Sequence, residues 1–290
     1  MNMQTEISSL LASQNPDGGW PYRLGGPSWT EPTGYAVLAL IACGNAPDPV
    51  ARALAWLHAA QRPDGGWTPQ PGVAQSTWVT AVVAFLGPRL LGDVPYQRGI
   101  AWLLAASGEE TKPFTRFHYW LAGQTPPRER RFPGWPWYPG TSAWVVPTAL
   151  SILALRKALR DQSSPAIRRR LDLGCSFLIN SACSDGGWNY GCPRALGHDA
   201  PSYPETTGVA ILATSGIQSR QVRQACTLAQ KQLLVCRTSE AQSWLRLGLL
   251  AHSQLPPRAA ALALPNRTTQ SAALALLAST AEQGRNIFLE

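Results

Sequence analysis

One four-residue string recurs along the chain and constrains the fold more than any other feature. Asp-Gly-Gly-Trp begins at Asp17, at Asp64 and at Asp185, and a degenerate copy, Phe-Pro-Gly-Trp, ends at Trp135. Repeated units of this size cannot bury their apolar faces alone, so they stack against one another. The sequence therefore predicts a repeat architecture in which these turns hold equivalent positions.

The segments around each turn have two kinds of helical pattern. After each turn comes a Thr-rich start and then a run of Ala, Val and Leu; two later segments, from 242 and from 269, have this pattern without a turn. A helix that is apolar nearly all round is buried on every side, whereas an amphipathic helix faces water on one side. The amphipathic segments are 5–14, 50–61, 96–107, 166–182, 220–234 and, weakly, 256–264.

Six hairpins of this kind close naturally into a double ring, with apolar helices inside and amphipathic helices outside. The predicted fold is all-α, an (alpha/alpha)6 toroid formed by residues 1–290 as a single domain. A segment at about 108–131 interrupts the third repeat and is predicted to be an insertion that is functional or binds a partner.

Composition excludes several classes of protein. Hydrophobic residues make up 45% and charged residues 14%, which is too apolar for a disordered chain. No apolar run approaches the roughly 18 residues of a membrane span, and the start of the chain has no secretory pattern, so we expect a cytoplasmic protein with its six cysteines as thiols. The net charge of +8 is carried mainly by Arg, which favours an acidic or phosphate-bearing partner; no nucleic-acid motif is present, and no nucleic-acid partner is expected.

One stretch resembles a known repeat. From Arg52 to Trp67 the chain joins a basic, a small, an aromatic and an aliphatic residue to Gln61 and a Gly-x-Trp turn. This is similar to the QW repeat of squalene-hopene and oxidosqualene cyclases. Partial matches occur at 14–20, 98–103 and 174–178. The resemblance implies the alpha/alpha toroid shared by terpenoid cyclases and protein prenyltransferase beta subunits. In it, the turn Trp would cover the inner helix and the Gln would cap the preceding outer helix.

The same resemblance directs attention to acids at the starts of the inner helices. Class II terpenoid cyclases protonate an isoprenoid with the central Asp of a D-x-D-D motif at that place, and this chain has no such motif. Aligning the inner helices puts Glu31 and Glu205 at the acid position, so these are the predicted catalytic residues. Neighbouring carboxylates that would raise their pKa are missing from the local sequence, which leaves burial to do so. The alternative is that both acids interact with the first turn of their helices.

The zinc site of protein prenyltransferases is not expected. Its Asp-x-Cys pair is replaced by Glu240-Ala-Gln242, and no His follows in the last repeat. The cluster from Cys183 to Asp199 has ligand-type residues at unusual spacing, and loop packing is the favoured interpretation. We therefore expect no metal and no cofactor.

Two sets of residues are candidates for binding a substrate. Aromatic residues near the inner-helix mouths would line an apolar cavity and stabilise cations, or would instead fill the core of the toroid; they are Trp29, Tyr35, Trp78, Trp144, Tyr203 and Trp244. Basic residues in the insertion form a weaker candidate site for a diphosphate; they are Arg116, His118, Arg128 and Arg131.

The leading hypothesis is a terpenoid cyclase-like or prenyltransferase-like toroid that binds, and transforms if it is an enzyme, an isoprenoid or similar apolar small molecule. Full-length class II cyclases react their substrate between two helical domains, so a protein partner or a homodimer would close the cavity, and the resemblance also implies peripheral membrane contact. The runner-up is a non-catalytic interaction or carrier scaffold. A third alternative, a sugar-processing enzyme, needs two carboxylates at one cleft, whereas Glu31 and Glu205 come from opposite sides of the ring.

Overall fold

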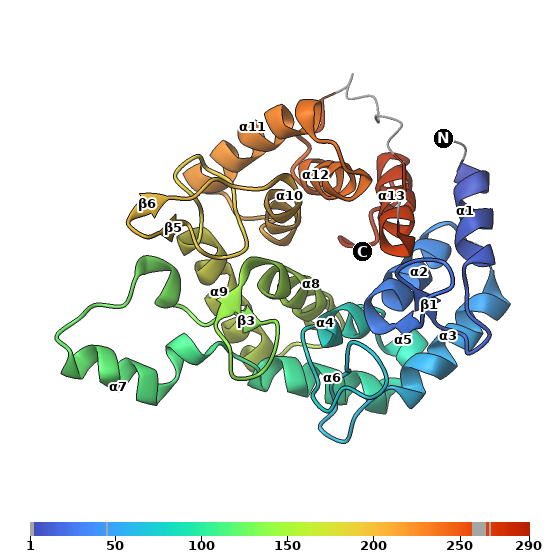
Figure 1. The fold of residues 1–290 in the computed structure, drawn as a ribbon, viewed down its shortest axis with the longest axis horizontal. Coiled ribbons are helices and arrows are strands. Elements are labelled where there is room, and N and C mark those ends of the chain that lie inside the picture. Colours follow the sequence, from blue (N-terminus) through green and yellow to red (C-terminus); the bar gives the residue numbers. More distant parts are fainter. Residues whose placement is uncertain (1–2, 45, 257–264, 267) are drawn as a thin grey trace.

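Six helices line the middle of a closed ring. The computed structural model describes residues 3–44, 46–256, 265–266 and 268–290. The inner helices run side by side around the centre (Figure 1); they are α2 (Thr30–Ala42), α4 (Val79–Ala84), α8 (Val145–Asp161), α10 (Pro204–Ala213), α12 (Ser239–Ala251) and α13 (Thr269–Glu282). Their side chains are almost entirely buried, as expected for helices that are apolar on all faces.

The outer layer consists of amphipathic helices packed against the inner ones. They are α1 (Met3–Ala12), α3 (Pro47–Ala59), α6 (Asp93–Ala105), α9 (Pro165–Asn180) and α11 (Arg220–Val235). Each buries one face, as α3 does with Val50, Ala53 and Leu57. The predicted all-α toroid is thus confirmed. Nearly all of the sixth outer segment, 256–264, lies outside the described residues.

The recurring turns connect the two layers through the tryptophan. The indole N–H of Trp67 donates to the carbonyl of Leu57 in α3 at 2.7 Å, while its backbone N–H donates to Oγ1 of Thr80 in α4 at 2.9 Å. The same two bonds occur at the other turns. The Thr near the start of each of these inner helices is therefore the acceptor for a buried N–H that would otherwise be unpaired.

The glutamine of the repeat has a different role from the expected one. The side-chain amide of Gln61 donates to the carbonyl of Gly65 at 2.9 Å and to that of Pro95, in the next outer helix, at 2.8 Å. The prediction that this Gln caps the preceding outer helix is wrong, because the Leu57 carbonyl at the end of that helix already accepts the Trp67 indole and the backbone N–H of Ala60. Gln61 instead joins its turn to the following repeat.

A second recurring bond joins neighbouring repeats and closes the ring. The backbone N–H of Thr30 donates to the carbonyl of Pro69, two residues beyond the next turn tryptophan, at 2.9 Å. Thr269 of the last inner helix makes the equivalent 2.9 Å bond to the carbonyl of Tyr22 in the first turn. Figure 1 shows α13 beside α2 and α1. The first and last repeats therefore meet through the same contact as sequential neighbours.

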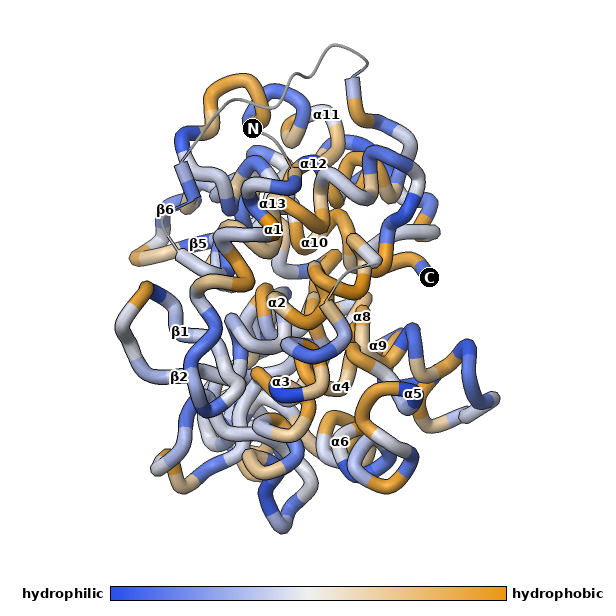
Figure 2. Tube along the Cα trace, turned by 90° about the vertical axis from the view of Figure 1, so that its right-hand side faces the viewer, coloured by the Kyte–Doolittle hydropathy of each residue, from blue (hydrophilic) through white to orange (hydrophobic). Residues whose placement is uncertain are grey.

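The two rims of the ring differ. At the N-terminal rim, where the inner helices begin, short strand pairs flank the turns: β1 (Trp20–Pro21) with β2 (Ser28–Trp29), β3 (Trp135–Pro136) with β4 (Ala143–Trp144), and β5 (Arg194–Ala195) with β6 (His198–Asp199). The C-terminal rim carries the short helix α5 (Pro88–Leu91) and residues 285–290. Figure 2 shows β1, β2, β5 and β6 on one side of the molecule and α5 and the C-terminal end on the other.

The insertion forms a separate feature at the edge of the ring. It contains the 3-10 turns η1 (Glu109–Thr111) and η2 (Arg128–Arg130) and the helix α7 (Pro113–Leu121), which lies at the periphery in Figure 1. No helix in the described ranges is long and apolar enough to span a bilayer. None of the six cysteines is in a disulfide.

Candidate acid site at the N-terminal rim

Glu31 lies in the first turn of α2 and is buried, with only 8% of its surface exposed. Its Oε2 accepts a hydrogen bond from the hydroxyl of Tyr22, and its Oε1 accepts one from Nε2 of Gln270 at 2.9 Å. Tyr22 follows the first turn, and Gln270 belongs to α13. The carboxyl group is thus held where the first and last repeats meet.

The surroundings of Glu31 favour its protonated form. Burial is the main cause and raises the pKa of Glu31 to about 8, with a further increase from the negative charge of Glu240. The hydrogen bonds from Tyr22 and Gln270 act in the opposite direction because they stabilise the carboxylate. Glu31 is therefore mostly a neutral carboxylic acid at pH 7. The local sequence has no carboxylate beside Glu31, but the like charge that it lacks comes from Glu240 of another repeat, in addition to the burial that was expected to raise the pKa.

Glu240 connects the two acids that the sequence singled out. Burial raises the pKa of Glu240, and the negative charge of Glu205 raises it further. Glu205 is partly exposed at the start of α10, and the Tyr190 hydroxyl lies 3.5 Å from its Oε1. Although Glu31 and Glu205 come from repeats on opposite sides of the ring, Glu240 is within electrostatic reach of both. Sequence reasoning considered Glu240 only as a lost zinc ligand.

Four of the predicted aromatic residues lie at the N-terminal rim, each beside an aromatic ring that follows a turn. Trp29 lies 5.4 Å from Tyr22 and Trp78 lies 4.7 Å from Trp137, measured between ring centroids. Trp144 and Tyr203 both lie next to Tyr190, at 6.5 and 5.5 Å. Tyr22, Trp137 and Tyr190 were missed, although each stands two residues after a turn tryptophan, a spacing that the sequence shows at three of the four turns.

The other two predicted aromatic residues are buried inside the ring. The rings of Tyr35 and Trp244 are in edge contact at 6.0 Å. Trp244 also contacts Phe288 at 5.8 Å, and Phe288 contacts Phe85 at 5.2 Å. These rings pack against one another inside the ring, and we call Phe85, Trp244 and Phe288 the aromatic floor.

The basic residues predicted to grip a diphosphate lie in the insertion, and their hydrogen bonds are made within it or to α9. Arg116 donates to the carbonyl of Arg131 at 2.8 Å, and Arg128 donates to Oδ1 of Asn180 at 3.0 Å. His118 packs on the ring of Phe114 at 4.6 Å. All are exposed or nearly so, and α7 lies away from the centre of the ring (Figure 1).

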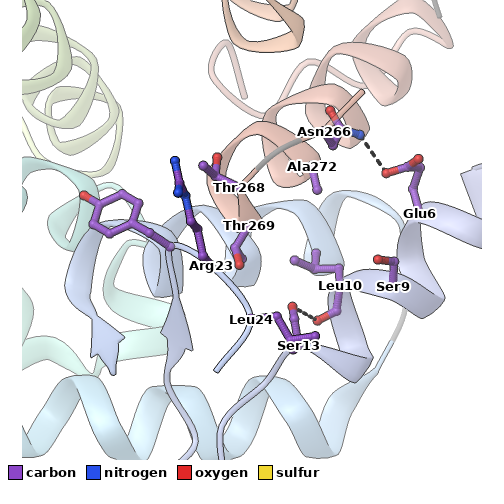
Figure 3. A pocket seen from close by; sticks show the side chains of 11 residues that line it. Glu6, Ser9, Leu10, Ser13, Arg23, Leu24, Asn266, Thr268, Thr269 and Ala272 are labelled. Carbon is purple, nitrogen blue, oxygen red and sulfur yellow. Dashed lines mark hydrogen bonds between the residues drawn. The ribbon is translucent and has the colours of Figure 1, made fainter. Parts of the chain in front are cut away.

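A polar pocket of about 250 Å³ lies at the seam between α1 and α13. Figure 3 shows Glu6 and Asn266 facing one another across it; Nδ2 of Asn266 donates to Oε2 of Glu6 at 2.7 Å. Arg23 and Thr268 lie on another side of the pocket. This bond adds to the closure of the ring. Among the described residues, no group of three His, Cys, Asp or Glu side chains could hold a metal ion.

Comparison with known proteins agrees with this architecture. The family model of the squalene-hopene cyclase N-terminal domain matches residues 3–136. No curated protein matches the sequence significantly. The type II terpene cyclase MstE from Scytonema, in its apo form, is 18% identical with a TM-score of 0.55, covering 99% of this chain and 80% of that one. A variant of it, solved with the substrate geranylgeranyl dihydroxybenzoate, is 17% identical with a TM-score of 0.57, covering 96% and 77%.

The fold is also similar to that of a second kind of enzyme. The endo-beta-1,4-glucanase CMCax from Acetobacter xylinum is 12% identical with a TM-score of 0.62, and the match covers 98% of both chains. The resemblance of this chain to the terpenoid cyclase-like toroids is confirmed by the family match and the shared fold. At these identities, the structural likeness shows the fold alone.

Proposed function

We propose that the protein binds an isoprenoid or similar apolar molecule at the N-terminal rim and that Glu31 protonates it. The single observation that carries this proposal is the buried Glu31, which has a pKa of about 8 and so keeps its proton at pH 7. A general acid needs a pKa near the working pH. The family match over residues 3–136 and the isoprenoid-bearing substrate of MstE support an apolar ligand.

The proposed step is a proton transfer to a carbon–carbon double bond. The O–H bond of Glu31 breaks, a C–H bond forms, and the bonding electrons of the O–H bond remain on Glu31 as a carboxylate. Tyr22 and Gln270 donate to that carboxylate, and the π faces at the rim, such as Trp29 and Trp78, stabilise the carbocation. Loss of a proton from the cation to water, directly or through the Glu240 carboxylate, yields the product, and the hydronium ion so formed returns a proton to the Glu31 carboxylate.

The test is native mass spectrometry and product analysis with squalene, geranylgeranyl diphosphate and geranylgeranyl dihydroxybenzoate. The expected result is bound ligand and a cyclised product from the native protein, with product lost in Glu31→Gln. Glu109→Gln, an exposed acid paired with Lys112, is the control and keeps activity. The same native mass spectra give the oligomeric state, and a dimer is expected if a second copy closes the N-terminal rim. Spectra free of ligand and assays free of product, from folded protein, would reject the proposal and favour an interaction scaffold.

We also propose that α7 mediates peripheral membrane contact. The helix buries none of its residues, and its large apolar side chains are exposed: Phe114 by 73%, Phe117 by 52%, Trp120 by 72% and Leu121 by 61%. Trp, Phe and Leu on one face beside basic residues are typical of helices at a lipid interface. In flotation with vesicles of phosphatidylglycerol, the native protein should float, whereas Phe117→Ser with Trp120→Ser should stay in solution. Equal flotation of both would reject this contact.

Glycoside hydrolysis is the second candidate function, and Glu240 favours it. A protonated Glu31 would act as the general acid, and Glu240 or Glu205 would supply a carboxylate at the same rim. The match to the glucanase CMCax, which covers 98% of both chains, supports this second candidate function. Release of reducing ends from carboxymethylcellulose, lost in Glu31→Gln, would establish this function. No release, from protein that converts an isoprenoid, would reject it.

A further inference from the structure

A pocket of about 430 Å³ lies at the C-terminal rim, on the opposite side of the ring from Glu31. Four chain segments meet there: the end of α2, residues 86–90, the last turn of α8, and residues 285–290. In Figure 2, α5 and the C-terminal end mark this side. Its apolar wall is formed by Ile41, Leu86, Leu90 and Ile287.

The same pocket carries an excess of positive charge. Four basic side chains line it, and they are Arg89, Lys157, Arg160 and Arg285. Asp161 and Glu290 are its acidic residues, and across the described ranges none of the four basic groups forms an ion pair with any carboxylate within 4.0 Å. Like charges around one cavity repel, and an anion placed among them relieves that repulsion.

Among the described residues, one of the four basic side chains donates a hydrogen bond to a carbonyl at the end of a helix. Nη1 of Arg285 donates to the carbonyl of Ala42 at the end of α2 at 2.8 Å, a normal contact for a cation at a helix C-terminus. Arg89 and Arg160 are exposed and, within the described chain, donate no hydrogen bond to a protein acceptor. Their guanidinium groups are therefore available to a ligand.

Lys157 is the most unusual of the four. Its ammonium group lies 4.7 Å from the centroid of Phe85, over the ring. Burial lowers the pKa of Lys157 and Arg160 lowers it further, while the negative charges of Asp161 and Glu290 act in the opposite direction. The ammonium has lost part of its hydration, and neither Asp161 nor Glu290 lies within 4.0 Å to form an ion pair with it, so an anion in the pocket would replace that hydration.

We propose that this pocket binds an amphiphilic anion, namely a phosphate or diphosphate group joined to an apolar chain. Arg89 and Arg160 bind the phosphate oxygens, for which the guanidinium fork has matching geometry, and Lys157 contributes a point charge. The apolar chain packs on Leu90 and Ile287. The site is separate from the acid at the N-terminal rim and does not depend on the function proposed there.

Isothermal titration calorimetry at constant ionic strength tests this site with inorganic pyrophosphate, farnesyl diphosphate and farnesol. Farnesyl diphosphate should bind more tightly than pyrophosphate, and farnesol should not compete with pyrophosphate. Titration of dihexanoyl phosphatidic acid in parallel distinguishes a phospholipid ligand from a prenyl diphosphate ligand. Arg89→Ala and Arg160→Ala should each weaken binding roughly tenfold, the usual effect of losing a charge-assisted hydrogen bond.

The matched control is Arg168→Ala with Arg169→Ala, which removes two exposed basic residues of α9 and should leave binding unchanged. Equal weakening by this control would overturn the proposal, because the binding would then depend on net charge alone. Farnesyl diphosphate that binds no more tightly than pyrophosphate would also overturn it. Glu31→Gln should retain binding here, so that failure at one rim is distinguishable from failure at the other.

Discussion

The Tyr22 hydroxyl is hydrogen-bonded to Oε2 of Glu31, joining the first turn of the ring to the acid that begins the first inner helix. Tyr22 also accepts, through its backbone carbonyl, the N–H of Thr269 that closes the ring. The position of the acid and the closure of the fold therefore depend on one residue, so changes at this place affect protonation and stability together.

Replacing Glu31 with Gln should alter how stability depends on pH. The pKa of Glu31 is 4.5 for the free side chain and about 8 in the folded protein, so the folded state holds the proton more tightly. The free energy of unfolding therefore falls as pH rises from about 4.5 to about 8. The Tm of Glu31→Gln should decline less steeply with rising pH than the native Tm. At pH 8 it should come closest to the native value or exceed it. Parallel Tm curves for the two proteins, recorded by calorimetry, would contradict this.

Tyr22→Phe should raise the pKa of Glu31 further. The Tyr22 hydrogen bond lowers that pKa, so its removal extends the protonated form to higher pH. Any activity that needs the protonated acid should decline at a higher pH than in the native protein, where the decline falls near pH 8. Tyr190→Phe, which affects the surroundings of Glu205, is the control and should keep the native midpoint. An unchanged midpoint for Tyr22→Phe, read from a pH–rate profile, would sink the idea.

Thr80→Val should destabilise the second repeat. The Oγ1 of Thr80 accepts the buried backbone N–H of Trp67 at 2.9 Å, and Val leaves that N–H unpaired. The expected loss is about 1 to 3 kcal/mol in the free energy of unfolding. Thr80→Ser keeps the hydroxyl and should lose much less. Urea unfolding of both variants measures the difference, and equal losses would show that the methyl group matters instead.

Gly65 and Gly72 have the same backbone φ of +91°, so comparing their Ala variants separates the cost of backbone strain from the cost of a steric contact. A Cβ on Gly65 would lie 2.6 Å from the carbonyl oxygen of Arg98, whereas a Cβ on Gly72 would meet nothing within 4 Å. Both Ala variants have the same unfavourable φ. Gly65→Ala should therefore cost about 1 to 3 kcal/mol more than Gly72→Ala, the usual range for overpacking. Chemical denaturation of the two variants gives this difference directly, and similar stabilities would argue against the close approach.

Phe288→Ala should open the aromatic floor. Phe288 is buried and packs on Phe85 and Trp244, so its loss removes about 3 to 5 kcal/mol and leaves a cavity. Small apolar molecules such as benzene should raise the Tm of this variant more than that of the native protein. Leu289→Ala, at a half-buried position next to it, is the control. A variant that benzene does not stabilise would indicate that the floor has collapsed.

The repeat pattern predicted much of the fold, because the turn tryptophan and the inner-helix Thr that it bonds stand 13 residues apart at three of the four turns. It also placed Glu31 at the start of its helix. The charge of Glu240 on Glu31, and the bonds from Tyr22 and Gln270, could not be predicted in this way, because they arise between repeats that meet only when the ring closes. The role of Gln61 was mispredicted for the same reason, since its second acceptor, Pro95, belongs to the next repeat.

The bond from Thr269 to Tyr22 also bears on how the protein unfolds. In a linear stack of repeats, the units at the two ends have one neighbour each and can fray first. Here the first and last inner helices each have two neighbours, so no repeat can detach without breaking two interfaces. The molecule should therefore lose its structure in a single cooperative transition, with amide exchange in the cores of all six inner helices governed by the same opening event.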